Sequence, residues 1–128
     1  MASESPREGG DPFSRASLEN AKGFIYIATN KTQGTLYIGV TNNLVRRIWE
    51  HKHKMIDGFT ANHNIHRLVY FELFDNIETA IAREKAMKKW NRNWKINRIA
   101  AMNPEWNDLY NYVVETLEWA PACAGTNT

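Results

Sequence analysis

Residues 23–41 read GFIYIATNKTQGTLYIGVT, and this stretch decides how the domain begins. It holds two runs rich in β-branched and aromatic residues, over residues 24–28 and 35–40, which favour β-strands. Between them lies a polar segment with Asn30 and Gly34, which tolerate the backbone conformations of a turn. Two such runs joined by a short polar segment predict an antiparallel hairpin.

The next segments alternate between helical and strand patterns. Residues 41–43, Thr-Asn-Asn, supply an N-cap for a helix over residues 44–53, and residues 55–64 read as a loop. Residues 68–74, LVYFELF, form a nearly continuous apolar run, which is typical of a strand buried on both faces. We therefore predict a buried central strand here.

Three more helices are predicted after this strand. Asp75 begins a capping box for a helix that ends near Trp90, with Asn76 as the competing cap. A second helix is expected over residues 93–102. Asn103-Pro104 has the form of an N-cap followed by Pro at the first helical position, which predicts a short third helix.

The order β-β-α-β-α-α-α predicts an α+β domain, a small three-stranded antiparallel or mixed sheet flanked by helices. We expect the ordered domain to span residues 21–117, after a disordered leader over residues 1–20 and before a flexible tail over residues 118–128. A chain of 128 residues suits one such domain. The single cysteine, the lack of a secretory signal and the lack of a long apolar run lead us to expect a cytoplasmic protein without membrane contact.

Charge is distributed unevenly along the chain. The net charge is +2, but residues 22–102 hold fourteen Lys or Arg against six Asp or Glu. Both flanking segments are acidic. A middle segment this basic fits a phosphate-binding surface, although an ordinary solvated helix face is the alternative.

Four side chains near the hairpin carry the chemistry of phosphate transfer. Tyr26 and Tyr37 lie in the two predicted strands, whereas Arg47 and His51 share one face of the following helix at spacing i,i+4. A guanidinium grips a phosphate through two hydrogen bonds. Taken singly, each tyrosine is also explained by sheet packing, and each basic residue by a solvated surface.

Glu84 interrupts an apolar stripe in the helix that follows residue 76. Ile77, Ala80 and Ile81 define the stripe, and Glu84 occupies its next position. A carboxylate on such a face is rarely buried unless it is paired or binds a metal. An i,i+4 pair with Lys88 is the simpler alternative.

This ordered set of residues resembles the GIY-YIG nuclease superfamily over about residues 23–99. The resemblance is carried by residues 23–26, 37–41, Arg47, His51 and 82–85. It is closest to small stand-alone bacterial proteins of the superfamily, which are related to the nuclease domain of the bacterial excinuclease C subunit. Phe24 replaces the usual isoleucine of the first motif, and the lysine that often follows the second motif is missing.

The resemblance implies a role for each residue. Glu84 would bind one Mg²⁺ or Mn²⁺, Arg47 would stabilise charge on the phosphate, and Tyr26 or Tyr37 would orient or deprotonate the attacking water. His51 is the alternative proton acceptor, because a tyrosine pKa near 10 makes a poor base at neutral pH. Some members also have an asparagine near the metal, late in the sequence. In this chain Asn97 is the candidate by position. Further contacts with nucleic acid are expected from Arg46, Lys52, Lys88 and Lys89.

The expected function is that of a metal-dependent endonuclease acting on nucleic acid, with DNA as the expected substrate and DNA repair as one role. A protein partner supplying specificity is compatible with so small a domain. The alternative is an inactive nucleic-acid-binding module of the same fold. A protein-interaction domain using Trp90, Trp94 and Trp106 is a third class, although the i,i+4 spacing of Trp90 and Trp94 is more simply core packing.

Overall fold

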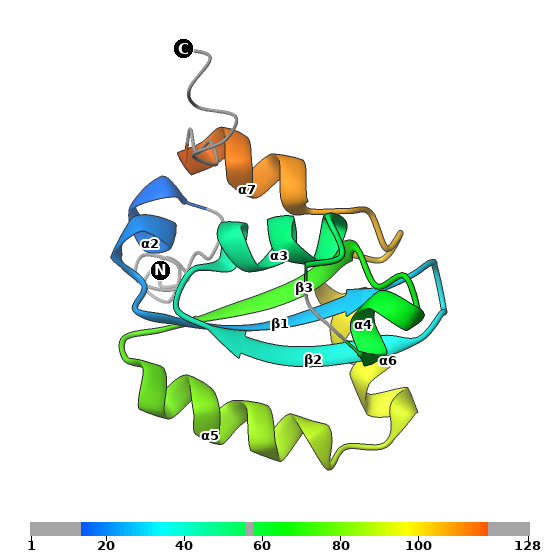
Figure 1. Ribbon diagram of the computed structural model, residues 1–128. Coiled ribbons are helices and arrows are strands. Elements are labelled where there is room, and N and C mark those ends of the chain that lie inside the picture. The colour runs from blue at the N-terminus through cyan, green and yellow to red at the C-terminus, as the bar shows by residue number, and fades with distance from the viewer. Residues whose placement is uncertain (1–13, 56–57, 118–128) are drawn as a thin grey trace.

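The computed structural model describes residues 14–55 and 58–117, and it shows the predicted α+β domain (Figure 1). A three-stranded sheet lies between two layers of helices. In chain order the elements are α2 (Arg15–Asn20), β1 (Gly23–Thr29), β2 (Leu36–Thr41), α3 (Leu44–Lys52), α4 (Phe59–Asn62), β3 (Arg67–Phe74), α5 (Ile77–Lys88), α6 (Arg92–Met102) and α7 (Tyr110–Leu117).

The sheet is antiparallel throughout and has the order β2-β1-β3. The prediction that residues 68–74 form the central strand is therefore wrong, because β1 is central and β3 lies at an edge. Other parts of the chain cover that edge: the Leu109 amide donates to the Leu68 carbonyl at 2.8 Å, and Asn103 Nδ2 donates to the Val69 carbonyl at 3.2 Å. These bonds and the helices on both faces explain why an edge strand is so apolar.

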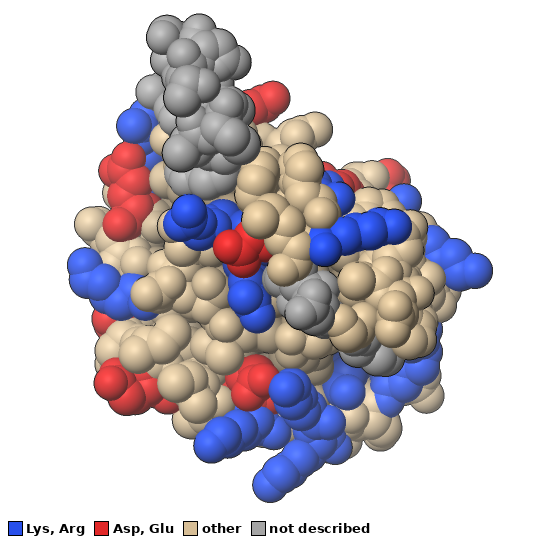
Figure 2. Space-filling model, viewed as in Figure 1, with Lys and Arg blue, Asp and Glu red and all other residues tan. Residues whose placement is uncertain are grey.

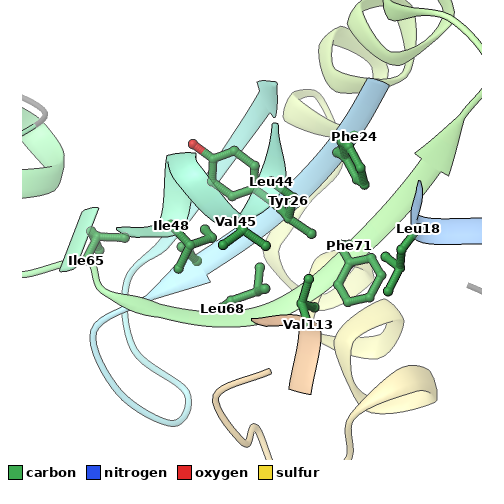
Figure 3. Close-up of a cluster of buried hydrophobic side chains, with 11 residues drawn as sticks. Leu18, Phe24, Tyr26, Leu44, Val45, Ile48, Ile65, Leu68, Phe71 and Val113 are labelled. Atoms are coloured by element: carbon green, nitrogen blue, oxygen red, sulfur yellow. The ribbon is translucent and has the colours of Figure 1, made fainter. Parts of the chain in front are cut away.

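Each face of the sheet has its own hydrophobic core. On one face, side chains of α2, α3 and α7 pack around Phe24, Tyr26 and Phe71 (Figure 3). On the other face, side chains of α5 and α6 pack around Ile25 and Ile27. Successive residues of β1 thus point to opposite layers, and β1 is buried along its whole length.

The ends of the domain differ from the prediction. Residues 15–20, expected to be part of a disordered leader, form α2, because Ser14 caps the helix and Leu18 enters the core with 3% exposure. The remainder of the predicted leader, residues 1–13, and the predicted tail, residues 118–128, lie outside the described residues.

The predicted helix starting at Asn103 is also absent. Asn103 instead ends α6 as its C-cap, and its side chain bonds both the amide and the carbonyl of Asn107. Trp106 adopts a positive φ of 57°, which is incompatible with a right-handed helix, and α7 begins only at Tyr110. The predicted loop after α3 contains the short helix α4.

Asparagine side chains cap the N-termini of α3 and α5. Asn43 caps α3 by accepting from the Arg46 amide, and Asn76, not Asp75, caps α5 by accepting from the Thr79 amide. Within residues 14–55 and 58–117, none of the helices has the length and apolar character needed to cross a membrane.

Candidate active site

Tyr26, on β1, lies at the centre of a cluster of polar side chains, which we call the Tyr26 cluster. Its ring is fully buried, and its hydroxyl lies at the outer end of the ring, beyond the aliphatic core (Figure 3). On β2 the residue opposite Tyr26 is Gly39. A Cβ at Gly39 would lie 2.4 Å from the Tyr26 hydroxyl, so glycine is required to make room for the phenol.

The Tyr26 hydroxyl joins two side chains of α3. Arg47 Nε donates to it at 3.3 Å, and His51 Nε2 lies 2.8 Å away. A hydroxyl oxygen that accepts from Arg47 can donate its own proton to Nε2, which places the proton of a neutral imidazole on Nδ1. Nδ1 is buried and has no hydrogen-bond partner among the described residues.

Burial sets the protonation states of this pair. It lowers the pKa of His51 to about 4, with the charge of Arg47 acting in the same direction. Burial also raises the pKa of Tyr26 well above its ordinary value, although the hydrogen bond from Arg47 opposes this shift. At neutral pH the pair therefore consists of a neutral imidazole and an un-ionised phenol.

Tyr37 and Arg47 are the members of this cluster nearest to solvent. The Tyr37 ring centroid lies 6.1 Å from that of Tyr26 and 5.5 Å from that of His51, and Tyr37 is only half-buried. The Arg47 side chain is 35% exposed, and its Nη1 lies 3.6 Å from a carboxylate oxygen of Glu50. The structure thus brings together four of the five predicted catalytic residues.

Glu84 lies apart from this cluster, on α5. Its side chain is 13% exposed, and its carboxylate is 2.6 Å from Lys88 Nζ, which is the ion pair that the spacing allowed. The adjacent residue, Arg83, pairs with Glu72 of β3. Neighbours on a helix are turned by about 100°, so Glu84 points away from the pair that Arg83 makes with Glu72.

Of the four side chains predicted to contact nucleic acid, two are exposed and two are paired with carboxylates. Arg46 and Lys89 are exposed, and basic side chains gather over α3 and over the last turns of α5 (Figure 2). Lys88 is held by Glu84. Lys52 is engaged in the fold, where Nζ lies 2.5 Å from Asp108 and donates to the His66 carbonyl at 3.0 Å. A phosphate contact by Lys52 would have to replace the pair with Asp108.

One feature of the site and one feature outside it were missed from the sequence. Glu50 lies beside Arg47, and its i,i+3 spacing could have identified it. A pocket on α6 contains Asn97, together with Trp94, which is 58% exposed. The prediction that Trp94 packs in the core is therefore wrong, whereas Trp106 is buried.

Comparison with known proteins places these residues in a family. The sequence profile of the GIY-YIG catalytic domain matches residues 22–97. A UPF0213 protein of Clostridium perfringens is 38% identical over 78 residues, which are 61% of this chain and 83% of that protein. A UPF0213 protein of Pediococcus pentosaceus is 34% identical over 74 residues, covering 58% and 78%. The solution NMR structure of a UPF0213 protein from Bacillus halodurans aligns with 67% of this chain and 90% of that chain, at 24% identity and a TM-score of 0.43.

Proposed function

Because the chain belongs to the GIY-YIG catalytic domain family, we propose that it is a metal-dependent endonuclease that hydrolyses phosphodiester bonds of nucleic acid, with DNA as the expected substrate. The observation that carries the proposal is the Tyr26 hydroxyl, shared between Arg47 and a neutral, buried His51. An ion pair that only stabilises the fold does not require a buried phenol between a guanidinium and a neutral imidazole. A phosphoryl-transfer site needs a cation that is fixed where charge develops, and the bond to Tyr26 fixes Arg47 in this way.

Tyr26 fixes the guanidinium of Arg47 for phosphate binding. Its hydroxyl accepts from Nε, which leaves the terminal nitrogens of the guanidinium for two oxygens of the phosphate. Glu50, at 3.6 Å, restrains one of them only loosely. Arg47 thereby stabilises the charge that develops on the phosphate as water attacks.

Tyr37 and His51 have different roles, because only Tyr37 reaches solvent. Tyr37 is the half-exposed phenol and orients the water. His51 Nε2 lies 2.8 Å from the Tyr26 hydroxyl, and a pKa of about 4 keeps its imidazole neutral beside Arg47 at neutral pH. Tyr26 is too deeply buried to meet a substrate and acts as a positioning residue between them.

Glu84 is the side chain that would hold a divalent cation. The described residues contain no group of three or more His, Cys, Asp or Glu placed to hold a metal, so the chain would supply this one carboxylate. That donor set fits Mg²⁺ or Mn²⁺, since Mg²⁺ keeps several waters and binds one or two carboxylates together with phosphate oxygens. Lys88 Nζ contacts one oxygen of this carboxylate, Oε2, and competes with an ion for it. The ion would stabilise the leaving oxygen.

A cleavage assay tests the proposal. Plasmid, single-stranded and branched DNA are incubated with Mg²⁺ or Mn²⁺ and the wild-type protein, Glu84→Gln or Glu78→Gln. Glu78 is the matched control, because it is an exposed glutamate in the first turn of the same helix. We expect cutting by the wild type and Glu78→Gln, and its loss in Glu84→Gln and in chelator.

Equal cutting by wild type and Glu84→Gln would contradict the role of Glu84. A protein that binds DNA in a salt-sensitive way but leaves every substrate intact would instead be the inactive binding module.

A further inference from the structure

A pocket of about 370 Å³ lies at the junction of α5 and α6, away from the Tyr26 cluster. Trp90, Trp94, Asn97, Arg98 and Ala101 line it. The two indole rings meet edge to face, with centroids 6.1 Å apart. Trp90 is half-buried, but Trp94 is 58% exposed and leaves most of its ring to solvent. Two tryptophans that line one pocket form a contiguous apolar surface, and contiguous apolar surfaces, unlike single exposed side chains, mark binding sites.

The surroundings of the pocket are strongly basic. Residues 83–98 hold seven Lys or Arg and a single acidic residue, Glu84. Arg98 lies over the Trp90 ring, with Cζ 5.7 Å from the centroid. Its side chain is exposed, and the carboxylate whose charge it feels, that of Glu72, is held by two hydrogen bonds from Arg83. Arg83 also lies over this ring, with Cζ 5.1 Å from the centroid, but it is already paired with Glu72. Arg98 is thus a cation available to a ligand.

We propose that this pocket is a stacking site for an unpaired base of single-stranded nucleic acid, with Arg98 binding the adjacent phosphate. This stacking site rests on the nuclease function proposed above, because its ligand is nucleic acid. An exposed indole beside an exposed cation is the arrangement with which proteins bind single strands, since every base offers an aromatic face. A protein partner is less well matched, because lysine is depleted in the buried centres of protein interfaces.

The pocket and the Tyr26 cluster lie on different sides of the sheet. Trp90 follows the last turn of α5, and α6 packs against β3, whereas Tyr26 and Tyr37 face the layer of α3. Lys88 and Lys89, at the end of α5, lead from the Glu84 side of that helix toward Trp90. A strand that binds both the Tyr26 cluster and the pocket has to pass from one face of the sheet to the other. Such a path favours substrates in which a single strand extends from the point of cleavage.

Binding measurements without cleavage test the stacking site. The full chain with Glu84→Gln, in chelator, is titrated into a fluorescently labelled single-stranded DNA and into the duplex of the same sequence. In this Glu84→Gln background, the second substitution Trp94→Ala should weaken single-strand binding by about tenfold. Trp94→Phe in the same background should keep most of the binding, because a phenyl ring still stacks. Duplex binding should change by less than about twofold, because paired bases cannot enter the pocket.

Two further variants separate stacking from charge and from general damage. Arg98→Gln should weaken single-strand binding and reduce the slope of log affinity against log salt by about one, the effect of one lost phosphate contact. Tyr112→Ala removes another exposed aromatic residue, on α7, and should change neither affinity.

Unchanged single-strand binding in Trp94→Ala, or no single-strand binding by either protein, would overturn the proposal. The first result would leave the indole for a protein contact. Loss of binding in Trp94→Ala, in a protein that cuts none of the DNA substrates, would uphold the stacking site while the nuclease function failed.

Discussion

Each face of the sheet carries one tyrosine that bonds to a charged network, and the two networks differ in how completely their groups are satisfied. On the α3 face, Tyr26 bonds Arg47 and His51. On the opposite face, Tyr70 donates to Glu72, which Arg83 also holds. Both tyrosines are buried, and burial raises the pKa of both. The partners of each tyrosine decide what its network can do.

The network of Tyr70 is closed. Arg83 grips Glu72 with two hydrogen bonds, Nε at 2.9 Å and Nη2 at 3.0 Å. Burial alone would raise the pKa of Glu72, but the bonds from Arg83 and Tyr70 outweigh it and hold that pKa below its ordinary value. Every charge has its partner at close range. Such a cluster fixes α5 against β3 and leaves nothing for a substrate.

The network of Tyr26 is open. The carboxylate nearest to Arg47 is that of Glu50 at 3.6 Å, and His51 Nδ1 has no partner among the described residues. Buried polar groups are usually satisfied, and the exceptions need an explanation. Here the loosely paired group is the guanidinium of Arg47, which the proposed reaction uses to bind the phosphate, and the unsatisfied group is Nδ1 of His51. The difference between the networks indicates chemistry on one face and stability on the other.

The largest effect on stability is expected from the pH response of His51. Its pKa is about 4 in the folded protein against an ordinary 6.5, so the unfolded chain binds a proton more readily. The stabilisation is complete above pH 6.5 and is lost as pH falls toward 4, by about 3 kcal/mol over the whole window. Urea unfolding between pH 7 and 5 measures it. The open network predicts a steady loss of stability on acidification.

Two variants assign that loss to His51. His51→Gln should flatten the change in unfolding free energy between pH 7 and 5, whereas His53→Gln, an exposed histidine at the end of α3, should leave it as in the wild type. A profile that stays steep in His51→Gln would mean that other groups cause the pH dependence.

A smaller effect distinguishes the two carboxylates. Glu72→Gln removes the charge from a pair whose side chains are 18% and 30% exposed, so it should lower the free energy of unfolding by about 1–2 kcal/mol. Glu50→Gln removes a more exposed and more distant partner, and it should cost less than about 0.5 kcal/mol. Thermal and urea unfolding compare them directly. Equal costs would erase the contrast between a closed and an open network.

Local signals in the sequence predicted the parts of the fold that depend on neighbouring residues. The hairpin, the Asn43 cap and the helix from residue 77 follow from such signals, and so does the common face of Arg47 and His51. The central position of β1 did not, because an apolar run at residues 68–74 reads the same whether a strand or the segment containing Leu109 covers its edge.

The errors have the same physical origin. Asn103 followed by Pro104 fits either end of a helix, and only the bonds to Val69 and Asn107 decide that it closes α6. The spacing of Trp90 and Trp94 places them on one helix face but does not say whether that face is covered. The burial of Tyr26 and the ion pair of Glu84 with Lys88 likewise depend on how separate elements pack.

The most direct test of this contrast exchanges one arginine in each network for lysine and measures cleavage and stability together. Arg47→Lys keeps the charge but loses the planar fork, and we predict a loss of DNA cleavage of at least about a hundredfold with little change in stability. Arg83→Lys should keep cleavage per folded molecule near that of the wild type while unfolding at lower temperature. Full cleavage by Arg47→Lys, or abolished cleavage by a folded Arg83→Lys, would contradict the assignment of chemistry to the Tyr26 network.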